Sequence, residues 1–256
     1  MFKEYFGIRF EFDHDEVDRI IEERIEKGIP GYVVSLDMNN FALARTDENH
    51  MKIVNSSIVN NCDSSWIPFF VNRLYHTNYT FYRGDDVFLS YIKKCKYRQF
   101  FLGSNQKVLN GLKKEMTKLD PQIANMRFED LPFRKVDEFD YDGIAKMINE
   151  DAPDIIWVSL GCPKQEQFMT KLLPYLKKGV MFGYGAIFNF YSGLDDVEKG
   201  APKWVVNMKL QFIYRLFQSP KKQWPRIKRA LNCMISSIKE EKAKIRASRT
   251  TNKRTI

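Results

Sequence analysis

Short apolar runs alternate with segments of helical periodicity between residues 30 and 190. The runs have the length and the β-branched and aromatic content of buried strands, which predicts strands at residues 32–36, 58–62, 98–102, 123–127, 154–160 and 180–184. The segments between them repeat apolar residues every three or four positions, which predicts helices at residues 39–45, 48–57, 84–94, 108–119, 141–149 and 164–176. Because strands that alternate with helices form parallel sheets, the fold class is α/β: a mainly parallel sheet with helices on both faces.

The N-terminal part departs from this alternation. Residues 1–12 alternate aromatic and polar side chains, which indicates a strand or a hairpin. A helix from Asp15 to Lys27 is expected next, with Gly28 after its end. Residues 66–83 are rich in aromatic side chains and fit neither period, so they receive no assignment.

The C-terminal part is predicted to be helical throughout its apolar length. Residues 204–217 read as one apolar helix that ends at Ser219-Pro220. A second helix is expected over residues 224–238, with an apolar stripe made of Trp224, Ile227, Leu231, Met234, Ile235 and Ile238. After Ser237 the chain turns to Lys, Arg, Ser and Thr, and we expect it to be frayed.

The charge divides the chain into two parts. The net charge is +9, but residues 203–256 hold 15 Lys and Arg and only two acids, a net charge of +13. Residues 1–202 hold the other 26 basic and 30 acidic residues, a net charge of −4. We therefore divide the chain into a body, residues 1–202, and a basic helical appendage, residues 203–256. The appendage is suited to an anionic surface.

Two anionic partners are conceivable for the appendage. A basic amphipathic helix with Trp224 on its apolar side suits a membrane interface rich in anionic lipid. Against nucleic acid, the appendage lacks a recognition motif and the body shows no basic face, so we expect no nucleic-acid partner. The plainer alternative is that residues 204–217 pack on the body and residues 221–254 are solvated.

Several classes of protein are disfavoured by what the sequence lacks. The four cysteines are far apart, which disfavours structural disulfides and fits a reducing cytosol: Cys62, Cys95, Cys162 and Cys233. The three histidines form no ligand cluster, so we expect no zinc site: His14, His50 and His76. Asp13-His14-Asp15 has the D-x-D spacing of some metal sites, but it opens a helix, where helix capping explains the acids. We see no signal peptide and no apolar run of membrane-spanning length.

Polar residues and glycines gather where the predicted strands end. They are Ser35, Asp37, Asp63, Gly103-Ser104-Asn105, residues 161–167 and residues 183–189. In a parallel sheet these groups converge at one edge, where open α/β sheets bind ligands. Residues 161–167 also bring unpaired helix amides, which favour a phosphate. The set suits a nucleotide diphosphate and a polyhydroxylated group, but it does not separate a transferase from a nucleotide-binding module. For any single residue, turn chemistry is a sufficient explanation.

Several motifs resemble those of the WecG/TagA/CpsF family of bacterial glycosyltransferases. The strongest is Val158-Ser-Leu-Gly-Cys-Pro-Lys-Gln-Glu166, which is similar to the family's V-G-L-G-x-P-K-Q-E segment. Other matches are Phe100-Phe-Leu-Gly103, Phe182–Asn189, Ser192-Gly193, Ala201–Trp204 and Leu210–Leu216. The resemblance extends over about residues 30–230 and is looser towards the N-terminus.

The resemblance implies an inverting glycosyltransferase that uses neither metal nor cofactor. Its donor is a UDP-sugar, commonly of the N-acetylmannosamine type, and its acceptor is a sugar on a polyprenyl diphosphate, for capsule, exopolysaccharide or wall polymer. The implied fold is a Rossmann-like catalytic domain, residues 1–202, with a membrane-associating appendage, residues 203–256. The implied location is cytoplasmic and peripheral, on the inner face of the cell membrane. A nucleotide-sugar-binding regulatory module without turnover is the alternative, and a homo-oligomer is left open.

The resemblance also implies roles for single residues. Asp63 would be the catalytic base that takes the acceptor hydroxyl proton, and Gln165 would contact the donor sugar or its phosphates. Asn189 stands where an Asp usually contacts uracil, and Ser35 and Asp37 stand for a Thr and an Asn near the sugar. The other residues expected to bind substrate are Arg83, Gly103, Ser104, Asn105, Gly161, Lys164, Glu166, Tyr184, Gly185 and Arg215.

The chain departs from the family pattern at a few of these positions. Ser64 replaces a Gly after the base, and Phe81 stands where an Arg is expected, with Arg83 nearby as a substitute. Gly200 replaces the Arg of R-A-P, and Gln211 replaces the Glu of L-E-W. These departures leave the donor sugar open, and the missing Arg argues against an acidic one.

Overall fold

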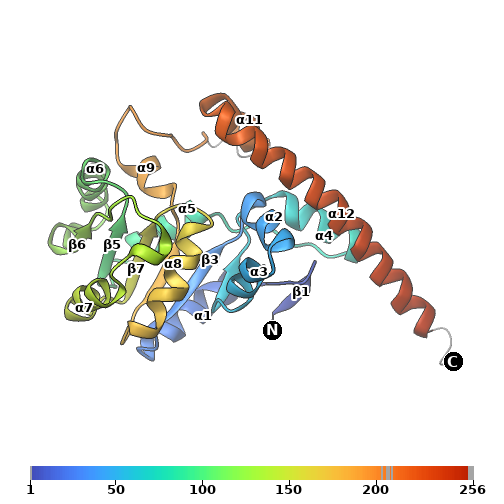
Figure 1. The fold of residues 1–256 in the computed structure, drawn as a ribbon, viewed down its shortest axis with the longest axis horizontal. Coiled ribbons are helices and arrows are strands. Elements are labelled where there is room, and N and C mark those ends of the chain that lie inside the picture. Colours follow the sequence, from blue (N-terminus) through green and yellow to red (C-terminus); the bar gives the residue numbers. More distant parts are fainter. Residues whose placement is uncertain (1, 203, 206–207, 209, 253–256) are drawn as a thin grey trace.

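The computed structural model describes residues 2–252 apart from 203, 206, 207 and 209. Its centre is a six-stranded parallel sheet with the strand order β4-β3-β8-β7-β5-β6 (Figure 1). These strands are β3 (Gly31–Ser35), β4 (Val59–Asn61), β5 (Gln99–Gly103), β6 (Arg127–Glu129), β7 (Ile155–Ser159) and β8 (Val180–Gly183). Because all six run in one direction, their carboxyl ends share one edge. The predicted Rossmann-like α/β fold is confirmed.

Helices cover both faces of the sheet. One face is covered by α1 (His14–Glu26), α5 (Gly84–Lys93), α6 (Gln106–Thr117) and α9 (Ile187–Tyr191). The other is covered by α2 (Met38–Thr46), α3 (Glu48–Asn55), α4 (Trp66–Tyr75), α7 (Tyr141–Asp151), α8 (Lys164–Leu172) and α12 (Pro220–Asn252). A separate antiparallel hairpin is formed by β1 (Lys3–Tyr5) and β2 (Ile8–Phe10), as the alternation near the N-terminus predicts.

Strand β7 shows how the sheet divides the core into two layers. Ile156 and Val158 belong to the cluster of apolar side chains on one face, and Trp157 belongs to the cluster on the other. This follows from the period of two along a strand. Trp157 is fully buried, and its indole Nε1 donates to Oε1 of the buried Gln99 at 2.6 Å. Replacing Trp157 with Ala would cost about 3–5 kcal/mol, because it removes a large buried side chain and leaves a cavity.

The structure corrects some of the predicted elements. The strand predicted at residues 123–127 begins only at Arg127, where β6 starts, because Pro121–Asn125 is a 3-10 helix whose first turn is capped by Asp120. The unassigned aromatic segment contains α4, whose apolar side packs on the core. Helix α1 begins one residue before the predicted cap, because Asp13 rather than Asp15 accepts the first helical amides.

The predicted helices of the appendage are partly wrong. The expected apolar helix over residues 204–217 falls partly outside the described residues; of the rest, Met208 and Leu210 are not helical, and α11 is Gln211–Gln218. Helix α12 begins at Pro220, not at residue 224, because a proline is tolerated in the first turn of a helix. It also continues to Asn252, past the point where fraying is expected.

Contacts with the body explain why α12 continues. Ala230, Cys233 and Met234 are buried in the same apolar cluster as α2. Further along, Tyr75 Oη donates to Oε1 of Glu241 at 2.6 Å, and the Arg45 guanidinium pairs with Glu240. Figure 1 shows α12 running along one side of the body, with its C-terminal end extending beyond it. The composition of the segment predicts fraying, but the tertiary contacts stabilise a helix.

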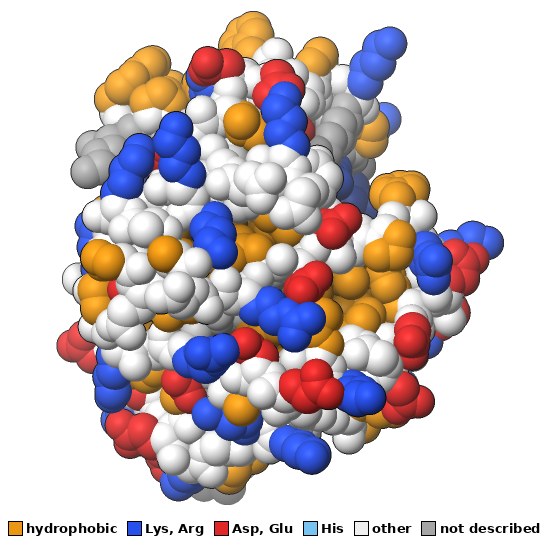
Figure 2. Space-filling model, turned by 90° about the vertical axis from the view of Figure 1, so that its left-hand side faces the viewer, with side chains coloured by type: hydrophobic (Ala, Val, Ile, Leu, Met, Phe, Trp, Pro, Cys, Tyr) orange, Lys and Arg blue, Asp and Glu red, His pale blue; other side chains and the backbone are white. Residues whose placement is uncertain are grey.

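The charges on the body are mixed, unlike those of the appendage. Figure 2 shows the side of the molecule on which β6 and α7 lie, and there Lys and Arg side chains are interspersed with Asp and Glu side chains. Several are paired, such as Arg127 with Glu129 at 2.7 Å and Lys171 with Asp137. This face offers no field of a single sign to a polyanion.

Candidate active site

A cavity of about 590 Å³ lies at the carboxyl edge of the sheet. Its walls are the segments that follow β3, β4, β5, β7 and β8, together with residues of the appendage. The expected site residues that line it are Ser35, Asp37, Asp63, Arg83, Ser104, Gly161, Lys164, Gln165, Tyr184, Gly185 and Asn189. The predicted convergence of the strand ends therefore occurs. Gly103, Asn105 and Glu166 are not among the lining residues, and the Arg215 side chain lies outside the described part of the chain.

Asp63 follows β4 and accepts hydrogen bonds from two neighbouring segments. The backbone N–H of Gly84 donates to Oδ1 at 3.0 Å, and Ser35 Oγ donates to Oδ2 at 3.0 Å. A Cβ at Gly84 would lie only 3.1 Å from Ser35 Oγ and 3.2 Å from Asp63 Oδ2, so glycine lets α5 begin against this pair. These donors fix the plane of a carboxylate in the cavity wall. A carboxylate so placed can accept a proton from a bound hydroxyl group.

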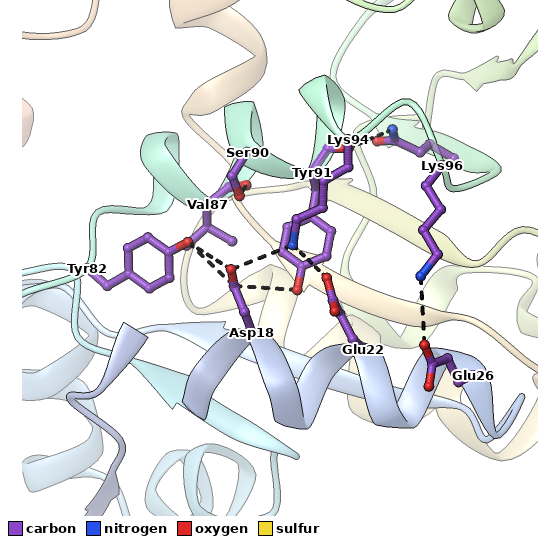
Figure 3. Close-up of polar contacts among 10 residues, drawn as sticks. Asp18, Glu22, Glu26, Tyr82, Val87, Ser90, Tyr91, Lys94 and Lys96 are labelled. Carbon is purple, nitrogen blue, oxygen red and sulfur yellow. Dashed lines mark hydrogen bonds and ion pairs between the residues drawn. The ribbon is translucent and has the colours of Figure 1, made fainter. Parts of the chain in front are cut away.

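The segment that carries Gly84 is held by hydrogen bonds to β4 on one side and to α1 on the other. Asn61 Nδ2 donates to the Tyr82 carbonyl at 3.0 Å, which ties the segment to β4. On the other side the Tyr82 hydroxyl donates to Asp18 of α1 at 3.4 Å, and Lys94 Nζ lies 3.6 Å from the same carboxyl group (Figure 3). Burial raises the pKa of Asp18. The α1–α5 contact therefore positions the backbone that donates to Asp63.

Arg83 lies in the same segment and is already paired. Its guanidinium forms an ion pair with Asp85, and its Nε lies 3.9 Å from Asp86. The three residues surround the first turn of α5, where acidic side chains favour the helix dipole. Arg83 lines the cavity as part of this pair, so it offers a partly neutralised cation to a ligand.

Gln165 connects the turn between β7 and α8 to the end of β8 by hydrogen bonds. Gln165 Oε1 accepts from the Gly161 N–H at 3.1 Å, and Nε2 donates to the Gly183 carbonyl at 2.6 Å. A Cβ at Gly185 would lie 2.7 Å from Gly161 N, so only glycine allows the two turns to approach this closely. Gln165 is largely buried although it lines the cavity. Its expected contact with a donor sugar stays a prediction.

Turn chemistry explains the residues that follow β5. Asn105 Oδ1 caps α6 by accepting from the Val108 N–H at 3.0 Å. A Cβ at Gly103 would lie 2.5 Å from the Ser159 carbonyl, and the Ser104 N–H donates to that carbonyl at 3.0 Å. Of these residues only Ser104 reaches the cavity wall. Their roles in the turn and the helix cap are therefore enough to explain Gly103 and Asn105.

The appendage contributes to the cavity, where sequence reasoning had placed only Arg215 of its residues by number. Gln218, Gln223 and Arg226 line it from α11 and α12. Two contacts hold this end of the appendage on the body: Arg229 Nη2 donates to Asn39 Oδ1 at 2.7 Å, and Gln218 is hydrogen-bonded to the backbone of Lys199 at 3.1 and 3.2 Å. The net charge of the segment hinted at a role for its cations, but no pattern in the sequence singled out Arg226.

The cavity is electrostatically uneven. Asp37 and Asp63 lie at the β3 and β4 ends, whereas Lys164 and Arg226 come from α8 and α12. The Lys164 ammonium also lies 5.1 Å from the ring centroid of Phe133, a cation–π contact on the loop after β6. The cationic side chains suit a phosphate group, and the carboxylates suit hydroxyl groups of a ligand.

The described part of the chain has neither a cluster of metal ligands nor a membrane-spanning helix. Within that part, His, Cys, Asp and Glu side chains form no group of three or more that could hold a metal ion. Among the helices whose residues are described, none is both long and apolar enough to cross a bilayer.

The fold and the cavity define a class: an open parallel α/β protein with a polar ligand site at the carboxyl edge of the sheet. A sequence profile narrows this class, because the profile described as "Glycosyl transferase WecG/TagA/CpsF family" matches residues 4–247. The chain belongs to that family. The match extends beyond the resemblance seen in the motifs and includes most of α12.

Several curated proteins are similar to part of the chain. One from Bacillus subtilis is 31% identical over 164 residues, which are 63% of this chain and 60% of that protein. One from Bacillus spizizenii is 28% identical over 163 residues, and one from Staphylococcus aureus is 27% identical over 145 residues. They cover 62% and 57% of this chain, and 60% and 52% of those relatives. Each relative is named N-acetylglucosaminyldiphosphoundecaprenol N-acetyl-beta-D-mannosaminyltransferase.

Proposed function

We propose that this protein is an inverting glycosyltransferase that moves a sugar from a UDP-sugar to a sugar linked to a polyprenyl diphosphate. The observation that carries the proposal is the position of Asp63: a carboxylate fixed by Ser35 and the Gly84 amide in the wall of a polar cavity at the ligand-binding edge of the sheet. Family membership and the names of the relatives support the reaction type and the acceptor class.

The cavity can accommodate such a donor with its two parts in different environments. A volume of about 590 Å³ is within the usual range for small-molecule sites. The diphosphate would lie against Lys164 and Arg226, and the sugar would lie towards Ser35, Asp37 and Asp63.

The reaction then needs one base and a stabilised leaving group. Asp63 would accept the proton of the acceptor hydroxyl while that oxygen attacks the anomeric carbon from the face opposite UDP. The bond between the anomeric carbon and the phosphate oxygen breaks, its electron pair leaves with UDP, and the configuration inverts. Cationic donors at Lys164 and Arg226 would stabilise the negative charge that develops on the diphosphate. The residues described here carry this scheme through proton transfer and electrostatics alone.

The outer side of α12 supports a membrane location for the acceptor. Trp224, Leu231 and Ile235 are exposed by 61%, 54% and 54% and recur at helical spacing, with basic residues beside them. An apolar stripe flanked by Lys and Arg suits the interface of an anionic bilayer. The protein would therefore be peripheral on the membrane face that presents the lipid-linked acceptor.

The donor is proposed to carry N-acetylmannosamine or another neutral hexose. The names of the relatives favour an N-acetylmannosamine donor, and another neutral hexose is compatible with the cavity. The product would serve a wall polymer, a capsule or an exopolysaccharide. The presence of Asp37 where the family commonly has Asn is the reason to test several donors.

A donor panel tests the proposal. UDP-N-acetylmannosamine, UDP-N-acetylglucosamine, UDP-glucose and UDP-galactose would each be mixed with N-acetylglucosaminyl-diphosphoundecaprenol in anionic vesicles, and UDP release would be followed. We expect release with at least one donor and only when the lipid acceptor is present. Tight UDP binding without release from any donor would contradict catalysis and favour a regulatory nucleotide-sugar-binding module.

A further inference from the structure

Glu166 is a buried carboxyl group that lies beside the cavity without lining it. It occupies the third position of α8 and is fully buried. Its Oε1 accepts two hydrogen bonds at 3.0 Å, from Asn40 Nδ2 and from Gln165 Nε2. Its Oε2 has no nitrogen or oxygen donor within the described part of the chain, and the Cys162 thiol lies beside the carboxyl group. A carboxyl group with one doubly used oxygen and one unused oxygen needs a reason beyond helix capping.

The two amides that bind Glu166 also bind the strand ends. Asn40 Nδ2 donates to the Ser35 carbonyl at the end of β3, at 3.1 Å. Gln165 Nε2 donates to the Gly183 carbonyl at the end of β8, and its Oε1 holds the Gly161 N–H after β7. One oxygen of Glu166 therefore connects, through two side chains, three of the turns that form the cavity wall.

The network also reaches outward from the cavity to α3. The amide oxygen of Asn40 is 2.6 Å from Nε2 of His50, which is buried as well. Asn40 thus uses its oxygen towards α3 and its nitrogen towards both Glu166 and β3. Because each member orients the next, loss of the central acceptor should loosen the strand-end turns together.

We propose that Glu166 is a positioning residue of this site: it holds the ends of β3, β7 and β8 in register through Asn40 and Gln165 and does not touch substrate. The reaction it serves is the proposed glycosyl transfer. The positioning itself is a property of the free protein and can be measured without any substrate.

Three substitutions separate positioning from simple packing. Glu166→Gln keeps an acceptor oxygen for Asn40 and Gln165 and places an NH₂ group at the unused position, so the turns should stay in place. Glu166→Leu keeps the approximate volume but removes the acceptor. Glu241→Leu is the matched control, because Glu241 is also a buried carboxylate that accepts one side-chain hydrogen bond, from Tyr75, far from the cavity.

The first measurement is amide hydrogen exchange in the ligand-free protein. The Gly161 N–H should exchange at least tenfold faster in Glu166→Leu than in the wild type, because its acceptor Gln165 loses its anchor. Glu166→Gln should exchange within threefold of the wild type, and Glu241→Leu should leave Gly161 unchanged even if it lowers the melting temperature. Wild-type exchange at Gly161 in Glu166→Leu, or equal acceleration in Glu241→Leu, would overturn the proposal. If Glu166→Leu does not fold, faster exchange in Glu166→Gln would overturn it and wild-type exchange would support it.

The second measurement connects the network to the site. Calorimetry with UDP should give a dissociation constant at least tenfold weaker for Glu166→Leu and within threefold of the wild type for Glu166→Gln. If the wild type turns over no donor, the proposed function fails while the exchange result still decides the positioning role. If the wild type does turn over, kcat should fall in Glu166→Leu and recover in Glu166→Gln, which a packing defect would not produce.

Discussion

The substitution Asp63→Asn removes the proposed base while it preserves the shape of the side chain. The structure predicts how the new amide must lie. The Gly84 N–H can only donate, so the amide oxygen takes the Oδ1 position, 3.0 Å away. The NH₂ group then faces Ser35 Oγ, whose hydroxyl can turn from donor to acceptor. Both hydrogen bonds survive, and the expected cost in folding free energy is about 1 kcal/mol or less.

The effect on the rate should be much larger than the effect on stability. Loss of a general base lowers turnover by roughly 10²–10⁴. At 1.36 kcal/mol per tenfold this is a barrier increase of about 3–5 kcal/mol. The melting temperature should fall by only about 2–4 °C, and UDP affinity should stay within about threefold, because the diphosphate is proposed to lie against Lys164 and Arg226 and not against Asp63.

The assay is UDP release at saturating donor and lipid-linked acceptor, with calorimetry for UDP binding. Asp37→Asn is the matched control, since it makes the same chemical change in the same cavity. Asp37 caps α2 by accepting from the Asn40 N–H at 2.8 Å, and Asn is an equally good cap. Its rate should stay within about tenfold. A near-normal rate in Asp63→Asn, or an equal loss in both variants, would refute the role of Asp63.

Three further outcomes follow from the structure. Arg226→Gln should lower kcat by about 10–100-fold through loss of a charged hydrogen-bond donor to the leaving group, whereas the exposed neighbour Lys228→Gln should stay within twofold in the same UDP-release assay. Burial raises the pKa of Glu166 from its ordinary 4.5 to about 7, so the contribution of this carboxyl group to stability is fully present below pH 4.5 and is lost as pH rises through 7. Urea unfolding should therefore show wild-type stability falling relative to Glu166→Gln by about 3 kcal/mol between pH 4.5 and 8, and a pH-independent difference would contradict this. Leu231→Glu should weaken binding to anionic vesicles more than tenfold in co-sedimentation, since it removes an apolar side chain from the proposed interface, while Leu119→Glu on the body should leave binding unchanged.

The groups that face Glu166 do little to favour its charged form. The charge of Asp37 also raises its pKa, and the Cys162 thiol beside it is itself kept protonated, because burial raises the thiol pKa. Burial lowers the pKa of His50, so the far end of the network carries no compensating charge. The positive charge of Arg226, in the appendage, slightly opposes this rise in the pKa of Cys162. Neighbouring charge thus adds little to stabilise the Glu166 anion, which supports the use of Gln as its neutral mimic.

The part of the site at the strand ends could be predicted from the sequence, because it depends on where each strand ends and on the parallel pairing of the strands. The apolar run that forms β7 fixes where the strand ends, and parallel pairing brings Ser35, Asp63 and Gly161 to one edge whatever the details of the loops. Capping was readable only in kind: the sequence predicts an acidic cap at Asp15, and the structure has the cap at Asp13.

The remaining parts depend on contacts between distant segments. Nothing in the local pattern says that α12 continues to Asn252, because Arg45 and Tyr75 stabilise it from the body. The same holds for Arg226, whose place in the cavity depends on how α12 crosses α2. Glu166 was expected to contact the substrate, yet it is fully buried beside the cavity. The burial of a side chain in the first turn of a helix depends on which distant segments pack against it.

The most direct test of the central claim is the product itself. Wild-type protein would be incubated with the best UDP-sugar donor and N-acetylglucosaminyl-diphosphoundecaprenol in vesicles, and the lipid would be examined by mass spectrometry and by NMR of the new anomeric centre. The account predicts one added sugar per acceptor, with the anomeric configuration inverted relative to the donor, and no product from Asp63→Asn within the same time. A product that retains the donor configuration, or an unmodified lipid in the presence of bound UDP-sugar, would contradict it.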